Sequence, residues 1–306
     1  MKQTTIFSRS ILLSLLLSIF PTWTQQTISS VNAEVSVGDL VDKITILEIK
    51  TQRIKDETKL KNIRIELETL YATYKKNITD SPELTQLTDA LRKVNETLWV
   101  LEDSTREKEA QQQFDAEFIQ LARSVYLNND ERGRIKRDIN RVAGSRIVEE
   151  KSYTEYRDNS KQPSGSTKAT HVQAGATSVT TEVAVGELVD KITILEIKLD
   201  RITDEAKLKN IRAELETLYQ AYTQIPYSEA MEQLKTQIRQ ANAKMWDIQD
   251  AIREKERTQT FDQEFINLAR GNFYTNDARC RVKRAINELA GSRIMEEKVY
   301  TEYRKA

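Results

Sequence analysis

Apolar residues recur every three or four positions along most of the chain, which is the spacing of amphipathic helices. The pattern predicts a first helix over residues 37–54, with Ser36 as its N-terminal cap. It predicts a second helix over residues 60–74. The isoleucine-rich residues 44–49 favour a strand in isolation, but a charged residue and the flanking periodicity favour helix. We therefore expect an all-α fold.

The third predicted helix is long and has a coiled-coil-like seam. It begins after Ser81, with Pro82 in the first turn, where the missing N–H costs no helical hydrogen bond. Its apolar residues then follow at intervals of three and four for about three heptads, a spacing that predicts a long helical hairpin. The seam consists of Leu84, Leu87, Leu91, Val94, Leu98 and Leu101.

Two shorter helices are expected after the long one. The fourth covers residues 114–125, and the fifth begins with Asp130 as its cap and ends at Gly144. The following residues 145–156 are compatible with helix or with extended chain. Five helices therefore make one unit.

This unit is encoded twice, and the undecapeptide LVDKITILEIK occurs in both copies without a difference. Residues 37–74 recur at an offset of 148 with 30 of 38 positions identical. Residues 114–157 recur at an offset of 147 with 29 of 44 identical. We therefore expect two tandem homologous helical-bundle modules, residues 34–157 and 182–306. The Ser- and Thr-rich residues 158–181 between them are typical of a flexible linker.

The first 33 residues have the features of a secretory signal peptide. Lys2 and Arg9 are the only charged residues there, and the predominantly apolar residues 11–20 follow them. Such a run is too short to span a bilayer, which takes about 20 residues, but it suits a signal. Val31 and Ala33 fit a cleavage site, although the distance from the apolar run also allows an earlier cut. We expect an exported protein, periplasmic or secreted, with no membrane span after cleavage.

Charge balance and two scarce residue types exclude several functions. Without residues 1–33 the chain has 45 basic and 47 acidic side chains, so no net field attracts nucleic acid. Cys280 is the only cysteine and is replaced by Gly133 in the first module, and His171, the only histidine, lies in the predicted linker. Neither module can therefore contain a histidine-based triad or a Cys/His zinc site. We expect no metal and no cofactor.

The middle of each module has diverged but keeps a polar and aromatic strip on the long helix. Residues 76–113 match their counterparts at only 13 of 38 positions. Five shared residues nevertheless fall within about 80° of the helical wheel, away from the seam. The strip is a candidate binding site for an anionic group; the alternative is a second packing surface with Trp as core. Its members, which we call the strip, are Arg92, Asn95, Trp99, Asp103 and Arg106, and Arg239, Asn242, Trp246, Asp250 and Arg253.

Two carboxylates and a basic set are further candidates. Glu48 and its counterpart Glu196 fall within the apolar face of the first helix, which predicts buried charges. We expect each to pair with an arginine such as Arg64 or Arg146; a ligand-binding or catalytic role is the alternative. The fifth helix carries shared basic residues away from its apolar positions, which predicts a solvated face, with Cys280 on it, or an anion site. They are Arg132, Arg134, Lys136 and Arg137, with Arg279, Arg281, Lys283 and Arg284 in the second module.

The string VGELVDKITILEIKLDRITDEAKLKNIRAEL, with FINLAR and GSRIMEEKVYTEY further on, resembles a bacterial all-helical family of unknown function. The resemblance covers essentially all of each module. Members of that family are similar to a single module without a signal, so this chain departs from the pattern by duplication and apparent export. The resemblance implies no catalytic residue.

Three functions are compatible with these features. The first is an exported, non-enzymatic interaction or scaffold protein whose tandem modules act as a pseudo-dimer and bind a protein partner, or self-associate, through helical faces. The second is a binding module for anionic glycans or phosphorylated sugars that uses the strip. The third is a carboxylate-dependent, glycan-active enzyme, which would depend on Glu48 because no catalytic motif is present. We favour the first.

Overall fold

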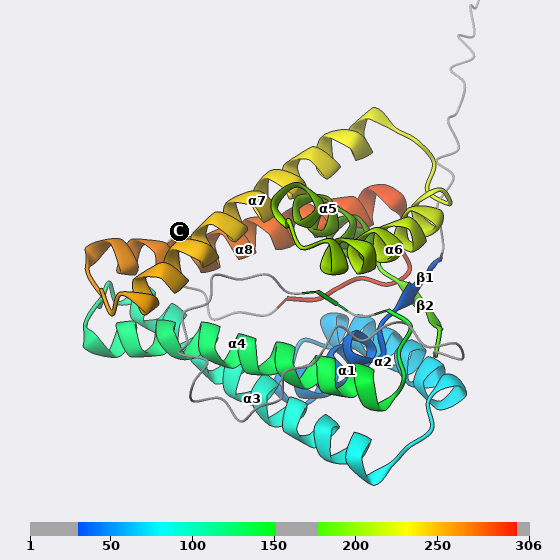
Figure 1. Ribbon diagram of the computed structural model, residues 1–306, viewed down its shortest axis with the longest axis horizontal. Coiled ribbons are helices and arrows are strands. Elements are labelled where there is room, and N and C mark those ends of the chain that lie inside the picture. Colours follow the sequence, from blue (N-terminus) through cyan, green and yellow to red (C-terminus); the bar gives the residue numbers. More distant parts are fainter. Residues whose placement is uncertain (1–29, 148, 151–176, 299–306) are drawn as a thin grey trace, which may run out of the picture.

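The structure is a computed structural model that describes residues 30–147, 149–150 and 177–298, and it confirms two homologous all-α modules (Figure 1). Residues 1–29 of the predicted signal and most of the predicted linker lie outside this part of the chain. The first module comprises β1 (Val31–Val35), α1 (Val37–Arg53), α2 (Glu57–Asn77), α3 (Pro82–Ala110) and α4 (Ala116–Val142). The second comprises β2 (Val179–Val183), α5 (Val185–Arg201), α6 (Glu205–Tyr222), α7 (Glu229–Arg257) and α8 (Gln263–Ala290).

Local capping signals begin α1 and α3 where the sequence predicts. The Ser36 hydroxyl accepts a hydrogen bond from the Asp39 N–H at 3.0 Å, whereas Ala184 at the equivalent position offers no side-chain cap. Ser81 caps α3 by accepting the Leu84 N–H at 3.1 Å. Each such cap stabilises a helix by about 1 kcal/mol.

The prediction of separate fourth and fifth helices is wrong, because α4 is one continuous helix of 27 residues. Its cap is Asp115, which accepts the Phe118 N–H at 3.0 Å. Asp130 lies inside the helix instead and pairs with Arg253 of the other module at 2.9 Å. The residue type that often starts a helix therefore serves here as a partner in tertiary structure.

Two short strands, which the sequence analysis did not predict, join the modules. β1 and β2 pair antiparallel, with Val31 opposite Val183 and the equivalent residues Ala33 and Thr181 opposite each other at the centre. Each strand packs on the other module, β1 on α6 and β2 on α2. Val31 and Ala33, 1% and 3% exposed, therefore belong to the core of the second module, and Val179 belongs to that of the first.

β1 also bears on the predicted module boundaries. It begins at Val31, three residues before the predicted start of the first module, and β2 begins at Val179, inside the predicted linker. Signal cleavage after Ala33 would remove three of the five residues of β1. Such a cut would therefore remove Val31 and Ala33 from the core of the second module.

The segments after α4 and α8 cross to the opposite module as well. Asn210 of α6 donates a hydrogen bond to Glu150 at 2.8 Å, and Asn62 of α2 donates to Glu297 at the same distance. Strand and tail are thus both exchanged between the modules. Neither module is complete without the other.

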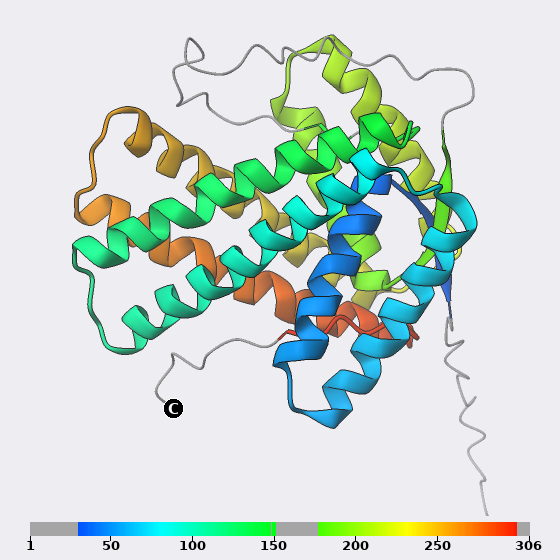
Figure 2. The same ribbon diagram turned by 90° about the horizontal axis from the view of Figure 1, so that it is seen from below.

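The modules are stacked, with the strand pair at one side and the tips of the α3–α4 and α7–α8 hairpins at the other (Figure 1). Figure 2, seen from below, shows the helices of the first module lying over those of the second. An apolar cluster joins the hairpin ends, where Phe118 and Tyr126 of α4 pack with Ile252, Phe265 and Phe273 of α7 and α8. The two modules therefore share apolar core at both ends of their contact.

Candidate functional site

A cavity of about 570 Å³ lies between the modules. Residues of α1, α3 and α4 form its wall on one side, and residues of α5, α7 and α8 form it on the other. The exchanged strands and tails contribute Ala33, Thr181, Glu149 and Glu296. Its size is within the range of small-molecule sites, about 300–1,000 Å³. Because both modules supply its wall, the cavity exists only when they are paired.

Charged side chains of both signs line the cavity. Among the described residues of its wall, ten are basic and eight are acidic, a surplus of two formal positive charges. Four of these basic residues also pair with carboxylates outside this set, Lys43 with Glu66, Lys191 with Glu214, Arg106 with Asp277 and Arg253 with Asp130, so the surplus is neutralised locally. The basic residues are Lys43, Lys50, Arg106, Arg132, Lys136, Lys191, Arg253, Arg279, Lys283 and Lys298, and the acidic residues are Asp39, Asp42, Glu102, Asp103, Glu149, Glu187, Asp190 and Glu296.

Ion pairs that cross between the modules form part of this wall. The Asp39 carboxylate binds Lys136 of its own module at 2.6 Å and Lys191 of the other module at 2.8 Å. Burial raises the pKa of Asp39, but the two lysines outweigh burial and hold that pKa well below its usual value. Burial lowers the pKa of Lys191, but Asp39 and Glu214 outweigh it and raise that pKa well above the ordinary lysine value. These side chains are therefore fixed, charged parts of the wall at neutral pH.

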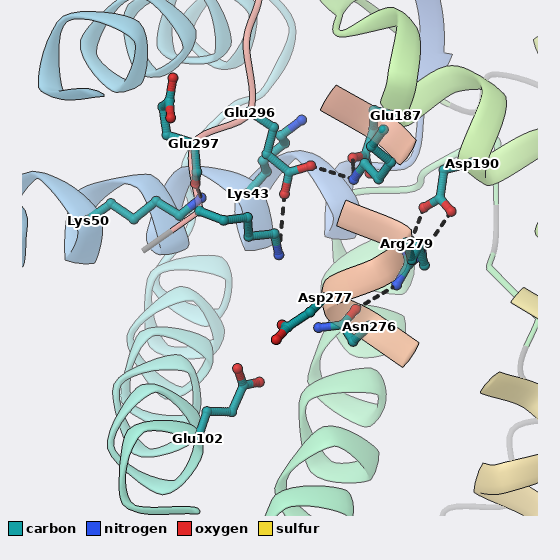
Figure 3. Close-up of polar contacts among 12 residues, drawn as sticks. Lys43, Lys50, Glu102, Glu187, Asp190, Asn276, Asp277, Arg279, Glu296 and Glu297 are labelled. Carbon is teal, nitrogen blue, oxygen red and sulfur yellow. Dashed lines mark hydrogen bonds and ion pairs between the residues drawn. The ribbon is translucent and has the colours of Figure 1, made fainter. Parts of the chain in front are cut away.

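A second kind of ion pair joins the first helix of each module to the last. Arg132 donates from Nε to Asp42 at 2.8 Å, and Arg279 donates to Asp190 at the same distance, as Figure 3 shows for the second module. Asn95 of the strip donates to Asp42 at 3.0 Å and completes the first of these sites. The strip and the basic set, which the sequence analysis considered separately, therefore meet at the cavity.

The shared basic set is divided between cavity and solvent. Arg132 and Lys136 line the cavity, whereas Arg134 and Arg137 are exposed. Cys280 also lines the cavity and is only half-buried, so its prediction as a residue of the exposed face is wrong. The reason is that this side of α8 lines the cavity between the modules, which the apolar residues of the helix do not indicate.

The strip meets the cavity differently in the two modules. Four of its first-module residues line the cavity, but only Arg253 does so in the second. Trp99 is half-buried, and the Arg53 guanidinium lies 5.6 Å from its ring centroid. The four are Asn95, Trp99, Asp103 and Arg106, while Arg92 pairs with Glu48. In the second module Arg239 pairs with Asp200, Asn242 donates to Asp190, and Trp246 and Asp250 are half-buried.

Glu48 and Glu196 are half-buried and paired, and neither is among the described residues of the cavity wall. Their side chains are 19% and 20% exposed. Glu48 binds Arg92 at 2.9 Å rather than Arg64 or Arg146, and Glu196 is held by a lysine and a tyrosine of its own module. Both carboxylates therefore lie at the edge of the helix packing.

Four reciprocal ion pairs hold the modules together at the hairpin end. Each contact occurs twice with the modules exchanged, as in an isologous two-fold interface. Two tyrosine hydroxyls add hydrogen bonds, Tyr126 to Glu256 at 2.5 Å and Tyr274 to Glu109 at 2.6 Å. The ion pairs are Arg106 with Asp277 at 3.2 Å, Arg253 with Asp130 at 2.9 Å, Arg123 with Glu256 at 2.8 Å and Arg270 with Glu109 at 2.7 Å.

Three lysines of the cavity wall are the main functional candidates that sequence reasoning missed. Lys43, Lys50 and Lys191 are polar members of an apolar helix and lie within the verbatim repeat. That position was the available signal, because a charged residue retained beside core residues has to be paired or to line a site.

Two features are absent from the described residues. No group of three His, Cys, Asp or Glu side chains in that part of the chain is arranged to hold a metal ion. No helix there is both long enough and apolar enough to cross a membrane.

The fold and the repeated contacts define a tandem-module helical protein built as one intramolecular pair. The chain belongs to a family of unknown function, DUF6165, whose model matches residues 31–170 and again residues 179–304. Both matches begin at the first residue of a strand, so β1 and β2 are part of the family's unit. No curated protein and no solved structure matched the chain.

Proposed function

We propose that this protein is a non-enzymatic binding protein whose modules act as a pseudo-dimer around a ligand cavity. The observation that supports it is the 570 Å³ cavity, whose wall is supplied by both modules. The reciprocal interface supports the pseudo-dimer, because the helical faces that would otherwise pair two chains are used within one chain. Catalysis by Glu48 is not part of the proposal, since Glu48 pairs with Arg92 away from the cavity.

The ligand that the cavity suits best is a phosphorylated sugar or a related small anion. The wall contains ten basic side chains, and guanidinium and ammonium groups bind phosphate through charge-assisted hydrogen bonds. Trp99 adds an aromatic surface beside Asn95 and Asp103, which offer polar groups to hydroxyls. These residues explain why a ligand with one anionic end and one hydroxyl-rich part fits better than a nucleic acid.

Calorimetric titration of the purified chain with glucose 6-phosphate, fructose 6-phosphate and glucose tests this proposal. We expect the phosphorylated sugars to bind at least about tenfold more tightly than glucose, a difference of about 1.4 kcal/mol. Ile194→Trp, which places a larger side chain in the cavity wall, should abolish binding. Val100→Trp is the control, because Val100 is 51% exposed. Equal affinity for glucose, or unchanged binding by Ile194→Trp, would reject the proposed ligand or its site.

We also propose that the protein is exported, which rests on the apolar residues 11–20 and the basic residues before them. Because Val31 and Ala33 lie in the core of the second module, the cut should fall before Val31. N-terminal sequencing of protein from the periplasmic and culture fractions would show this. A mature chain that begins at Glu34, or a chain that stays whole in the cytoplasm, would contradict the proposal.

A further inference from the structure

Lys50 differs from the other lysines of the cavity wall in the partner of its amine. It lies in the last turn of α1, is 6% exposed and lines the cavity. Its Nζ donates a hydrogen bond to the main-chain oxygen of Glu297 at 2.8 Å (Figure 3). Lys136 and Lys191, by contrast, bind carboxylates. Within the described residues, Lys50 forms no such ion pair.

This environment shifts the protonation equilibrium of the Lys50 amine toward the neutral form. Burial is the largest influence and lowers the pKa of Lys50; Glu296 and Glu66 raise it, Lys298 and Lys43 lower it, and the result is a pKa below the ordinary lysine value. The main-chain carbonyl orients the amine but is uncharged, so it holds the proton less firmly than a carboxylate would. A desolvated lysine amine with its lone pair available is a nucleophile toward carbonyl carbon.

We propose that Lys50 forms an imine with the carbonyl group of a ligand held in the cavity, an inference that rests on the cavity being a ligand site. The nitrogen lone pair attacks the carbonyl carbon to give a carbinolamine. This intermediate loses its hydroxyl group as water, so that C=N replaces C=O and both hydrogens of the neutral amine leave with the oxygen. No atom is oxidised or reduced. The ligand class is a phosphorylated aldehyde or ketone.

The second module offers a matched control. Lys198 is equivalent to Lys50 and is buried to the same degree, at 7% exposed. Unlike Lys50, it is not among the residues that line the cavity in the described part of the chain. The two lysines thus separate the effect of burial from the effect of access to the cavity.

Reductive trapping tests the proposal with pyridoxal 5′-phosphate as the probe. The full chain is incubated with less than one equivalent of probe at pH 7.5, reduced with sodium borohydride and mapped by peptide mass spectrometry. We expect the adduct at Lys50 to exceed that at any other lysine by at least about tenfold, since Lys50 combines a lowered pKa with a place in the cavity wall. Lys50→Arg should abolish this adduct, and Lys198→Arg should leave it unchanged.

An adduct spread evenly over exposed lysines of the wild-type chain would overturn the proposal, and this result does not depend on any variant folding. Pyridoxine 5′-phosphate has an alcohol in place of the aldehyde. It therefore tests anion binding by the cavity separately from the reactivity of Lys50. If this analogue binds by calorimetry but no adduct forms at Lys50, the reactive lysine is rejected and anion binding stands. If an adduct forms at Lys50 while the analogue does not bind, anion binding is rejected and the reactive lysine stands.

Discussion

At the scale of single residues, the contact between the modules depends on buried charges. The Arg106 side chain is 1% exposed and pairs with Asp277 of the other module, beside the Phe273 ring. Removing one partner of a buried ion pair leaves the other charge uncompensated in a poorly solvated place. Such residues fix which surfaces can meet more than they add to stability overall.

Arg106→Met should therefore lower the free energy of unfolding by about 3 kcal/mol, because Asp277 loses its cross-module partner. Urea denaturation followed by circular dichroism measures this. Arg134→Met is the control, since Arg134 is exposed and its pairs with Glu131 and Asp138 lie on the surface, so the change should stay within about 0.5 kcal/mol. Equal losses in the two variants would mean that the Arg106 pair is not buried in solution.

At the scale of the elements, α1 contacts α4, and α5 contacts α8, at a glycine whose lack of a side chain allows the close approach. A Cβ atom on Gly38 would lie 2.5 Å from the main-chain oxygen of Lys136, and one on Gly186 would lie 2.3 Å from that of Lys283. Main chain cannot move aside as a flexible side chain can. In each module the first and the last helix can therefore pack this closely only with glycine at this position.

Gly38→Ala and Gly186→Ala should each lower the free energy of unfolding by about 2 kcal/mol, because the added methyl group forces the helices apart. Gly271→Ala, where the nearest atom is Cδ1 of Ile248 at 3.4 Å, should instead raise it by up to about 1 kcal/mol through helix propensity. Thermal unfolding of the three variants gives the comparison. The critical result is that Gly38→Ala and Gly186→Ala lower the free energy of unfolding while Gly271→Ala raises it. A Gly38→Ala variant as stable as the wild-type chain would rule out the close approach.

The helices could be predicted from the sequence because their signals are local, as with Ser36 and Ser81. The strands could not, because the central residue of β1, Ala33, pairs with Thr181, 148 residues away, and the five residues of β1 overlap a plausible cleavage site. The strip could be found on the long helix, yet nothing local indicates that Asn95 would meet Asp42. The cavity was beyond prediction for the same reason, since its wall exists only after the modules pair.

Deleting residues 31–35 should expose the core of the second module, because β1 packs on α6. Hydrogen–deuterium exchange compares this deletion with a chain that begins at residue 30. We expect the exchange rates of α6 amides to rise at least about tenfold, a loss of about 1.4 kcal/mol in local opening. The effect should be larger in α6 than in α2. A larger effect in α2 would contradict the exchange of the strand.

At the scale of the whole molecule, the exchanged strands, the exchanged tails and the paired hairpins make the two modules one cooperative structure. Cutting the chain at a protease site inserted between residues 160 and 170 should therefore not separate them. We expect both fragments to elute together in gel filtration at low micromolar concentration. Fragments that elute singly would show that the interface is too weak to act as a pseudo-dimer.

Acid should weaken the structure through ion-paired carboxylates such as Glu187, which pairs with Lys283. Burial raises the pKa of Glu187, but Lys283 and Lys43 outweigh burial and lower it to about 2. A carboxylate with a lowered folded-state pKa contributes stability that is complete above its unfolded pKa of about 4.3 and is lost as the pH falls toward 2. The urea midpoint should stay level from pH 7 to pH 5 and then fall. Glu187→Gln should fall less steeply, and identical slopes would exclude this contribution.

The reciprocal hairpin interface has a consequence for how this protein can change. Glu109 and Glu256 occupy equivalent positions in the two modules. They accept hydrogen bonds from Tyr274 and Tyr126, and these two tyrosines do not occupy equivalent positions. The equivalents of these tyrosines are Leu127 and Phe273. In a dimer of identical chains every substitution appears in both halves at once, so such a mismatch could not arise. When the two halves are joined in one polypeptide, a substitution in one half is not repeated in the other. A cavity between two halves that were once identical can therefore become asymmetric and bind an asymmetric molecule.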